Sequence, residues 1–407
     1  MGQEKEKSGK SRGKRTEGRG KKRTGKVSLC ELLGVGFVLL LFGFGLLNIL
    51  HKDRQFSEAE NRMLEQAPQW QWSSVFDGRF MKSFERWQTD QFVFRDGWIR
   101  LRTGADRLLG KKESGGVFLG TDGSLYEKPG EIGEQTWNNL DALRQFCQRH
   151  PELNTYMMFV PDAAGVKPEG LPPFAPVESQ EEQLLQIQSY LGEDVRQIPV
   201  YEALREHREE YIYYRTDHHW TTLGAWYAYR EAASVMELEG AAEGLTDAPA
   251  LYPVSDSFEG TLVSKSGYPA KADVISVYWP EESEELVVTY VEEQEKSASL
   301  YASEKLETKD QYGMFLNGNH PLIRIRTTAE SKRSLLLVKD SYANCFVPYL
   351  TSQFREIVLV DPRYYYGNLE SLMEQQTFTD VLFLYNLNTF LADDVLHLTL
   401  EEASTGE

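Results

Sequence analysis

The fold is decided by the stretch Ser334-Leu335-Leu336-Leu337-Val338, which runs directly into Lys339-Asp340-Ser341. A continuous apolar run of this length indicates a central parallel strand, because such a strand is buried on both faces. Similar runs follow at Ile357–Val360 and Val381–Tyr385, and another precedes them at Tyr156–Val160. Helical patterns separate these runs, and this alternation predicts an α/β fold with a doubly wound parallel sheet. The helices expected around the sheet cover residues 136–150, 178–191, 224–240, 342–352 and 368–375.

Polar residues follow the apolar runs directly, at Asp340-Ser341, Asp361 and Asn386. In sheets of this kind, binding sites form beyond the carboxyl ends of the strands. Ser341 stands where a strand gives way to a helix, so backbone N–H groups at the helix start are available as an oxyanion hole. A serine alone is a poor nucleophile and needs a base. Ser341 is therefore a candidate nucleophile whose base must come from elsewhere in the chain.

The candidate base lies in the segment Asp217-His218-His219-Trp220, which holds two of the 7 histidines in the chain. This segment is expected to be extended and to lead into a helix with a threonine cap. Side chains at positions i and i+2 of an extended segment share one side, so Asp217 and His219 can act together while His218 points away. The carboxylate would hold one imidazole nitrogen and the other nitrogen would face Ser341, which is the arrangement of a catalytic triad.

Two other interpretations of this segment stay open. Asp217 can form the turn before the helix while both histidines pack beside Trp220. Asp217, His218, His219 and His320 are also all possible metal ligands. Neighbouring histidines in an extended segment point in opposite directions and seldom reach one ion. We therefore expect no bound metal and no cofactor.

The segment Leu32–Leu50 contains no charged residue. A helix of this length extends about 28 Å, close to the thickness of the hydrocarbon core of a bilayer. Residues Met1–Lys26 carry 11 Lys/Arg and 3 Asp/Glu, and the positive-inside rule keeps such a tail in the cytoplasm. The sequence therefore predicts a single-pass type II membrane protein whose chain after His51 is extracytoplasmic. A cleaved signal peptide is the alternative, although the apolar run is long for one and no clear cleavage site follows.

Charge and cysteine content exclude further classes. The net charge of the chain is −18, and because the basic tail contributes +8, the remainder carries −26. An acidic remainder argues against nucleic-acid binding, which needs a basic face. The three cysteines, Cys30, Cys147 and Cys345, are too few for a disulfide framework. We expect them to be thiols, and whether Cys147 and Cys345 pair depends on the fold.

The sequence divides into a basic tail, a membrane anchor, a stalk with a packing helix, and a folded domain. Their expected bounds are 1–26, 27–50, 51–112 and 113–400, in that order. Within the stalk, one helix is predicted from about Val75 to Leu109, with its aromatic side chains in a core. Within the domain, residues 251–320 are predicted to form an inserted excursion that carries a small sheet.

The segment 214–225 reads YRTDHHWTTLGA and resembles the bacterial DHHW protein family. It is also similar to a wider group of SGNH-hydrolase-like proteins that O-acetylate alginate, in which an Asp-x-His-Trp segment precedes a Gly-Asp-Ser segment. The order is the same here, with Asp217-x-His219-Trp220 before Lys339-Asp340-Ser341, although Lys339 replaces the glycine. Other pieces that resemble the family are Glu60-Asn61-Arg62, residues 90–95, Gly318-Asn319-His320-Pro321 and Asp361-Pro362-Arg363-Tyr364-Tyr365.

The resemblance implies an SGNH-hydrolase-like domain in which Ser341 is the nucleophile, His219 is its base and Asp217 orients the base. Arg363 and Asn386 follow strand ends, where capping and turn formation are equally plausible roles. The candidates for binding the substrate or an oxyanion are Arg363, Asn386, Asn319 and Tyr342.

These expectations favour an extracytoplasmic carbohydrate O-acetyltransferase that acts on a cell-wall or exopolysaccharide hydroxyl. Acetyl-CoA is absent outside the cytoplasm, so the expected partner is a multi-pass membrane acyltransferase that exports the acyl group. The alternatives are a carbohydrate esterase with the same triad and a non-catalytic, polysaccharide-binding protein of the cell surface.

Overall fold

The computed structural model of the protein describes residues 29–57, 62–76, 78–238, 248–280 and 285–401. The basic tail expected over residues 1–26 lies outside the described residues. Glu60 and Asn61, from one of the segments that resemble the family, lie outside them as well.

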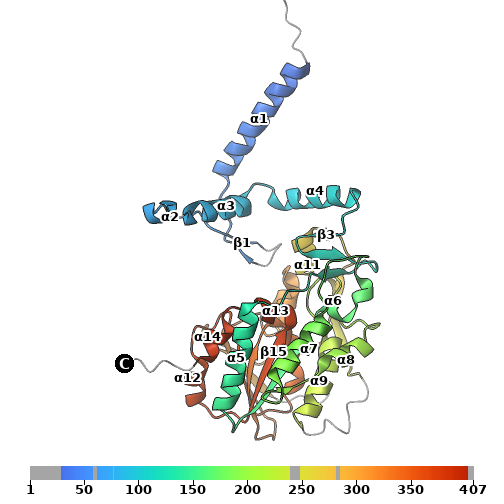
Figure 1. The fold of residues 1–407 in the computed structure, drawn as a ribbon, viewed down its shortest axis with the longest axis vertical. Helices are drawn as coiled ribbons and strands as arrows, with labels where there is room; N and C mark the ends of the chain where they lie inside the picture. The colour runs from blue at the N-terminus through green and yellow to red at the C-terminus, as the bar shows by residue number, and fades with distance from the viewer. Residues whose placement is uncertain (1–28, 58–61, 77, 239–247, 281–284, 402–407) are drawn as a thin grey trace, which may run out of the picture.

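Helix α1 spans Leu29–Leu50 and contains the expected apolar segment. Its residues Leu32–Leu50 are long and apolar enough to cross a membrane, and none of them is buried against the rest of the chain. Figure 1 shows α1 rising from the remainder of the protein as a separate rod. One such helix near the amino terminus fits a single-pass membrane anchor or a signal sequence.

Three helices cross the inner end of α1: α2 at Trp72–Phe76, α3 at Arg79–Gln91 and α4 at Arg95–Leu108 (Figure 1). The prediction of one helix from Val75 to Leu109 is wrong, because Phe94 has a φ of 59°, a left-handed conformation that separates α3 from α4. The predicted burial of the aromatic side chains is also wrong for several of them, and Phe94 is 71% exposed. A short antiparallel pair, β1 (Phe56–Ser57) and β2 (Arg62–Met63), follows α1.

The body of the protein is built on an eight-stranded sheet in the order β11-β10-β12-β14-β13-β15-β6-β7. The bounds of these strands are β6 Asn154–Val160, β7 Arg196–Gln197, β10 Leu286–Tyr290, β11 Glu295–Ser297, β12 Leu322–Thr327, β13 Ser334–Lys339, β14 Glu356–Val360 and β15 Asp380–Asn386.

The five strands from β14 to β7 run parallel, as the apolar runs predict. β10, β11 and β12 are antiparallel to their neighbours, so the central sheet is mixed, whereas the sequence predicts a doubly wound parallel sheet. The physical reason lies in β10, whose side chains alternate between buried and more exposed positions, the pattern of an antiparallel strand. β10 and β11 therefore extend the central sheet, whereas β8 (Leu251–Phe258) and β9 (Asp273–Tyr278) form a separate pair.

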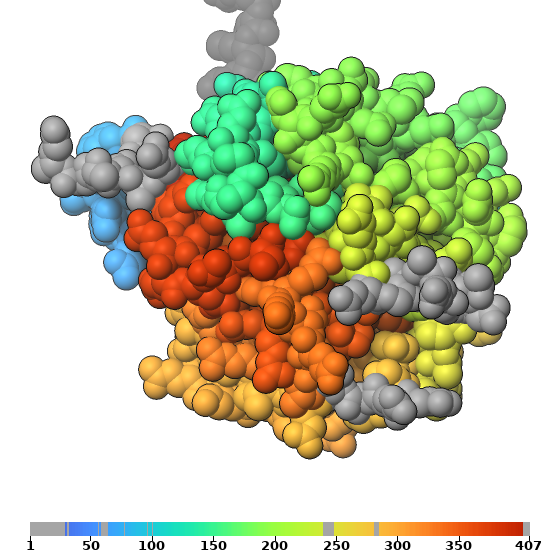
Figure 2. Space-filling model, turned by 90° about the horizontal axis from the view of Figure 1, so that it is seen from below, coloured from blue at the N-terminus to red at the C-terminus, as the bar shows by residue number. Residues whose placement is uncertain are grey.

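Hydrophobic cores lie on both faces of the sheet. Leu335 and Leu337 of β13 point into one core, with α8 (Val200–Glu206) and α9 (Thr222–Val235). Leu336 and Val338 point into the other. The helices on that second face are α5 Glu134–Arg149, α7 Gln180–Leu191, α12 Leu369–Glu374, α13 Leu387–Ala392 and α14 Leu396–Leu400. Seen from the end farthest from α1, the red carboxyl-terminal segment lies between the teal α5 and the orange β-rich segment (Figure 2).

The helix predicted over residues 342–352 is two 3-10 helices, η4 at Ser341–Cys345 and η5 at Val347–Leu350. Pro348 has no N–H, so a continuous α-helix would lose a hydrogen bond there. The three cysteines are free thiols in the structure.

The carboxyl ends of the parallel strands face α2–α4, because α13, which follows β15 directly, lies at that end (Figure 1). A three-stranded sheet and a short helix lie between this end and α4 (Figure 1). Their bounds are β3 Glu113–Ser114, β4 Val117–Leu119, β5 Leu125–Glu127 and α11 Thr261–Ser266.

Candidate active site

Ser341 lies where β13 ends and η4 begins, as the apolar run predicts. The side chain of Asp340 caps η4 by accepting a hydrogen bond from the N–H of Tyr342 at 2.9 Å. The other oxygen of Asp340 accepts from the N–H of Asn386 at 2.9 Å, which joins the ends of β13 and β15. Among the described residues, the N–H of Ser341 donates to no acceptor. This serine therefore combines a fixed backbone with a free donor beside its hydroxyl.

His219 lies within hydrogen-bond reach of this serine. Its Nε2 lies 2.8 Å from Ser341 Oγ, although 122 positions separate the two residues in the chain. The next residue, Trp220, donates its indole N–H to the carbonyl of Tyr342 at 2.9 Å. Thr221 then caps α9 by accepting from the N–H of Gly224, as the sequence predicts. The histidine segment is thus fixed to the serine turn on one side and to a helix on the other.

Asp217 holds the far side of the imidazole. Its Oδ1 lies 2.5 Å from His219 Nδ1 and also accepts from the backbone N–H of His219 at 3.1 Å. Its Oδ2 accepts from the N–H and the hydroxyl of Thr261, at 2.8 and 3.0 Å, where α11 begins. Gly260 is required beside it, because a Cβ there would come within 2.3 Å of the Asp217 Cβ. All the acceptor positions of the carboxylate are occupied.

Burial sets the protonation states of this pair. Burial lowers the pKa of His219 to about 4, and His218 contributes to this lowering. The effect of His218 on this pKa is larger than the opposing effect of the Asp217 charge. Burial alone would raise the pKa of Asp217, but His218, His219 and the hydrogen bonds outweigh it and hold that pKa well below its usual range. At neutral pH the imidazole is therefore neutral beside an ionised carboxylate. Its proton sits on Nδ1, and Nε2 is free to accept from Ser341.

Tyr312 forms one wall of the site, and sequence reasoning missed it. Its ring stacks on the His219 imidazole with centroids 3.8 Å apart and planes 13° apart. Its hydroxyl donates to the carbonyl of Ser341 at 3.1 Å. An aromatic face at this distance stabilises a positive charge, such as the imidazolium that forms when His219 takes a proton. Tyr312 lies in the excursion 251–320, where neither periodicity nor spacing distinguishes it.

His218 lies beside His219, with ring centroids 3.9 Å apart, so the prediction that it points away is wrong. The segment bends and is not a regular strand, so the alternation of an extended chain does not hold. His218 Nδ1 lies 3.0 Å from the Thr261 hydroxyl. Ligand atoms of Asp217, His218 and His219 fall within 4.8 Å of one another, the spacing of a possible metal site. The fourth candidate ligand, His320, lies apart and contacts Glu293 at 2.6 Å.

Arg363 and Asn319 lie in a charged network beside the serine turn. The guanidinium of Arg363 donates two hydrogen bonds to the carboxylate of Asp361, of 2.8 and 2.7 Å. Asp361 and Asn319 also accept from Lys339, each at 3.4 Å, and Lys339 itself is fully buried. Arg363 is partly exposed. Its positive charge also lowers the pKa of His219, by less than burial and His218 do. Lys339 thus bonds to Asn319 directly and is linked to Arg363 through Asp361.

Asn386 and Tyr342 have structural contacts. The Asn386 side chain caps α13 by accepting from the N–H of Thr389 at 3.2 Å, and it donates to the carbonyl of Val160 at 3.1 Å. This is the capping role that the sequence left open. The hydroxyl of Tyr342 donates to the carbonyl of His218, and its N–H is already bonded to Asp340. The polar groups of both side chains are therefore already engaged in hydrogen bonds within the protein.

Comparison with known proteins gives the family. The family model of the DHHW proteins matches residues 154–360, about half of the chain. No curated protein matches the sequence. A DHHW family protein from Eubacterium siraeum has a similar fold, with a TM-score of 0.60 at 24% identity over 71% of this chain and 95% of that one. Bacillus cereus PatB1, solved with a sulfonyl adduct, gives 0.56 at 20% identity over 68% and 96%.

A weaker likeness, with a TM-score of 0.43 at 15% identity over 69% of this chain and 93% of the other, is to the O-acetyltransferase domain of Pseudomonas putida AlgJ. The matched residues of the family model include both the histidine segment and the serine turn described above. This chain belongs to the DHHW protein family.

Proposed function

We propose that this protein is an extracytoplasmic carbohydrate O-acetyltransferase that uses Ser341 as nucleophile, His219 as base and Asp217 as the orienting carboxylate. The observation that carries the proposal is the unbroken hydrogen-bonded chain from Asp217 through His219 to Ser341, at 2.5 and 2.8 Å. Nucleophile, base and orienting group within this reach are the signature of covalent acyl transfer.

The chemistry follows from this order. Ser341 Oγ attacks the carbonyl carbon of an acetyl donor while its proton passes to His219 Nε2. The tetrahedral intermediate collapses, the donor's leaving group takes that proton, and acetyl-Ser341 remains. A sugar hydroxyl then gives its proton to His219, attacks the acetyl carbonyl and releases Ser341 as the free alcohol. Asp217 stays ionised throughout and stabilises the imidazolium that forms twice in each cycle.

Two groups stabilise the developing oxyanion in this proposal, a backbone N–H donor and a guanidinium. The N–H of Ser341 heads η4 and is free among the described residues, as an oxyanion donor must be. Arg363 adds a guanidinium close enough to influence the His219 pKa. We assign substrate binding to Arg363 and to the exposed Asn319.

A relative of similar fold and the order of the two motifs support the substrate class. A sulfonyl group is an electrophile that an activated hydroxyl captures, and PatB1, with a similar fold, has been solved with a sulfonyl adduct. The order of the two motifs is that of SGNH-hydrolase-like proteins that O-acetylate alginate, and we place the mixed α/β domain in that class. With α1 as a type II anchor, the acetyl donor comes from the membrane, and a multi-pass acyltransferase is the partner we propose.

Covalent trapping tests the nucleophile. The full-length chain in detergent is treated with phenylmethylsulfonyl fluoride, and the adduct is located by peptide mass spectrometry. We expect one adduct, on Ser341, that is lost in Ser341→Ala and kept in Ser352→Ala, which removes an exposed serine. An unmodified wild-type chain, or an adduct that survives Ser341→Ala, contradicts the proposal.

A second assay separates the transferase from the esterase and from the non-catalytic alternative. The chain is incubated with 4-nitrophenyl acetate and a cell-wall or exopolysaccharide oligosaccharide. Acetylated oligosaccharide supports the transferase, whereas free acetate alone identifies an esterase. Oligosaccharide binding with neither product, together with no adduct at Ser341, identifies a polysaccharide-binding protein.

A further inference from the structure

Helix α4 carries an apolar stripe that no described residue of the body covers. Phe94 caps the helix, and Trp98, Leu101 and Leu108 recur at helical spacing along one side of it. They are 71%, 43%, 63% and 91% exposed, which is unusual for a group of large apolar side chains on one helix face. The only small member of the stripe is Ala105. The stripe therefore needs an apolar environment from outside the body.

The opposite side of α4 packs on the body. The hydroxyl of Thr103 donates to the carbonyl of Ser266, at the end of α11, at 2.8 Å. A Cβ at Gly267 would lie 3.0 Å from Thr103 and 3.5 Å from Ile99, so these side chains press against the chain there. Since Thr103 and Ile99 lie across the helix from Leu101 and Leu108, the apolar stripe faces away from the body.

The stripe faces the side from which α1 rises. The ring of Phe44 in α1 lies 5.8 Å from Trp98 and 6.5 Å from Phe92. The side chain of Asn48 accepts from the N–H of Val93 at 3.1 Å, which ties the last turn of α1 to the α3–α4 junction. Figure 1 shows α2, α3 and α4 lying across the end of α1 in one layer. A bilayer crossed by α1 would meet this layer at its surface.

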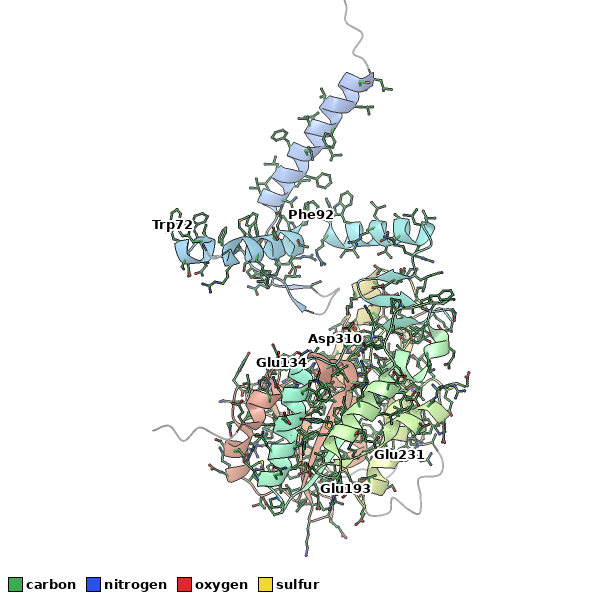
Figure 3. All side chains as sticks on the ribbon, in the orientation of Figure 1. Trp72, Phe92, Glu134, Glu193, Glu231 and Asp310 are labelled. Carbon is green, nitrogen blue, oxygen red and sulfur yellow. The ribbon has the colours of Figure 1, made fainter. Side chains whose placement is uncertain are left out.

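Aromatic residues continue along the layer beyond α4. Trp70 and Trp72 are 60% and 66% exposed and contact each other, and Trp70 also contacts Phe80. Trp72, the first residue of α2, and Phe92, which follows α3, are both labelled in Figure 3. Tryptophan at such positions is typical of the interface between lipid headgroups and acyl chains.

The charge of this layer is opposite to that of the protein as a whole. Residues 72–108, from the start of α2 to the end of α4, contain 7 Lys/Arg and 5 Asp/Glu, a net charge of +2 in a chain of net charge −18. Glu193 and Glu231 lie at the end of the body farthest from the layer (Figure 3). An anionic membrane surface attracts the basic layer and repels the acidic body, which favours one orientation.

We propose that α2, α3 and α4 lie in the plane of an anionic phospholipid surface, with the stripe Phe94–Leu108 inserted among the headgroups. With α1 across the bilayer, the protein then has two membrane contacts, one spanning and one in the interface. Amphipathic helices with apolar and basic sides bind lipid surfaces in this way. The carboxyl ends of the parallel strands, which carry the candidate active site, face this surface (Figure 1).

A nitroxide label at Leu101 tests the proposal in the full-length chain. Cys30→Ser and Cys147→Ser remove the accessible thiols, and the buried Cys345 is kept. Leu101→Cys is labelled, and Ser189→Cys, at an exposed position on α7, is the matched control. Both proteins are reconstituted in vesicles of phosphatidylcholine and phosphatidylglycerol. Electron paramagnetic resonance then measures the accessibility of each label to oxygen, which concentrates in lipid, and to a water-soluble nickel chelate.

We expect the label at Leu101 to be more accessible to oxygen than to the nickel chelate, and the label at Ser189 to show the reverse. Omitting phosphatidylglycerol should lower the ratio at Leu101, and an unchanged ratio overturns the role of anionic lipid. Equal aqueous accessibility at Leu101 and Ser189 overturns the proposal. Dipolar broadening at Leu101 also overturns it, because the stripe would then be covered by a second copy of this chain.

Discussion

Replacing the carboxylate of Asp217 by an amide, Asp217→Asn, tests the candidate triad most sharply, because it changes little volume and removes one charge. The carboxylate accepts from His219 on one oxygen and from Thr261 on the other. An amide has one oxygen and one NH2 group. If the NH2 group faces His219, the imidazole proton must move to Nε2, which can then no longer accept from Ser341. If it faces Thr261, the half-buried N–H of Thr261 loses its acceptor.

The magnitude follows from these contacts. A stranded donor costs about 1–3 kcal/mol in either orientation, and losing a charge-assisted bond to the imidazolium costs about 1.5–3 kcal/mol more. A total of about 4 kcal/mol in the transition state slows the reaction about a thousandfold, since about 1.36 kcal/mol corresponds to a factor of ten.

The measurement is the rate of Ser341 sulfonylation in the full-length chain, compared with Asp256→Asn as the control. Asp256 is exposed, so the same chemical change there should leave the rate unchanged. Urea unfolding of both variants checks that the fold is retained. A folded Asp217→Asn protein that reacts as fast as wild type would refute the assignment of Asp217.

Four further experiments follow from the geometry. The sulfonylation rate should fall to half its value near pH 4, because burial lowers the pKa of His219 to about 4 and only the neutral imidazole accepts the proton. A midpoint at about pH 6.5, the ordinary pKa of histidine, would contradict this prediction. Gly260→Ala should abolish most of the activity by displacing Asp217, whereas Gly104→Ala, where a Cβ meets nothing within 4 Å, should not; equal rates would show that the carboxylate tolerates the shift. Lys339→Ala should lower the free energy of unfolding by roughly 3 kcal/mol, since it removes one partner of a buried ion pair, and an unchanged urea midpoint would argue against that pairing. Treatment with a chelator should leave the rate unchanged, and loss with recovery on added zinc would support the metal interpretation instead.

The apolar runs predict the parallel strands well, because strands buried on both faces need apolar residues at every position. Val381–Tyr385 and Ser334–Val338 are both such runs, and both become central strands. The antiparallel edge is different. β10 alternates in burial, and a pattern of this kind does not tell which sheet a strand joins or in which direction it runs.

The candidate site divides in the same way. Asp217 and His219 can be paired from their spacing, because both lie in one short segment. Tyr312 cannot be found, since its place on the imidazole depends on how the excursion 251–320 folds back on the serine turn. The position of His218 is wrong in the sequence analysis for a related reason: alternation applies to regular strands, and this segment bends.

The short helix α11 has a practical consequence for anyone who prepares this protein as a soluble fragment. One end of α11 binds Asp217 through Thr261, and the other end binds Thr103 of α4. A fragment that begins after Leu109 keeps every residue of the candidate triad, yet it lacks Thr103. Among the described residues, the carbonyl of Ser266 then keeps the hydrogen bond from Ser114 alone. Kinetic constants measured on such a fragment describe a carboxylate with looser support, and their difference from the full-length values measures what α2, α3 and α4 contribute to turnover.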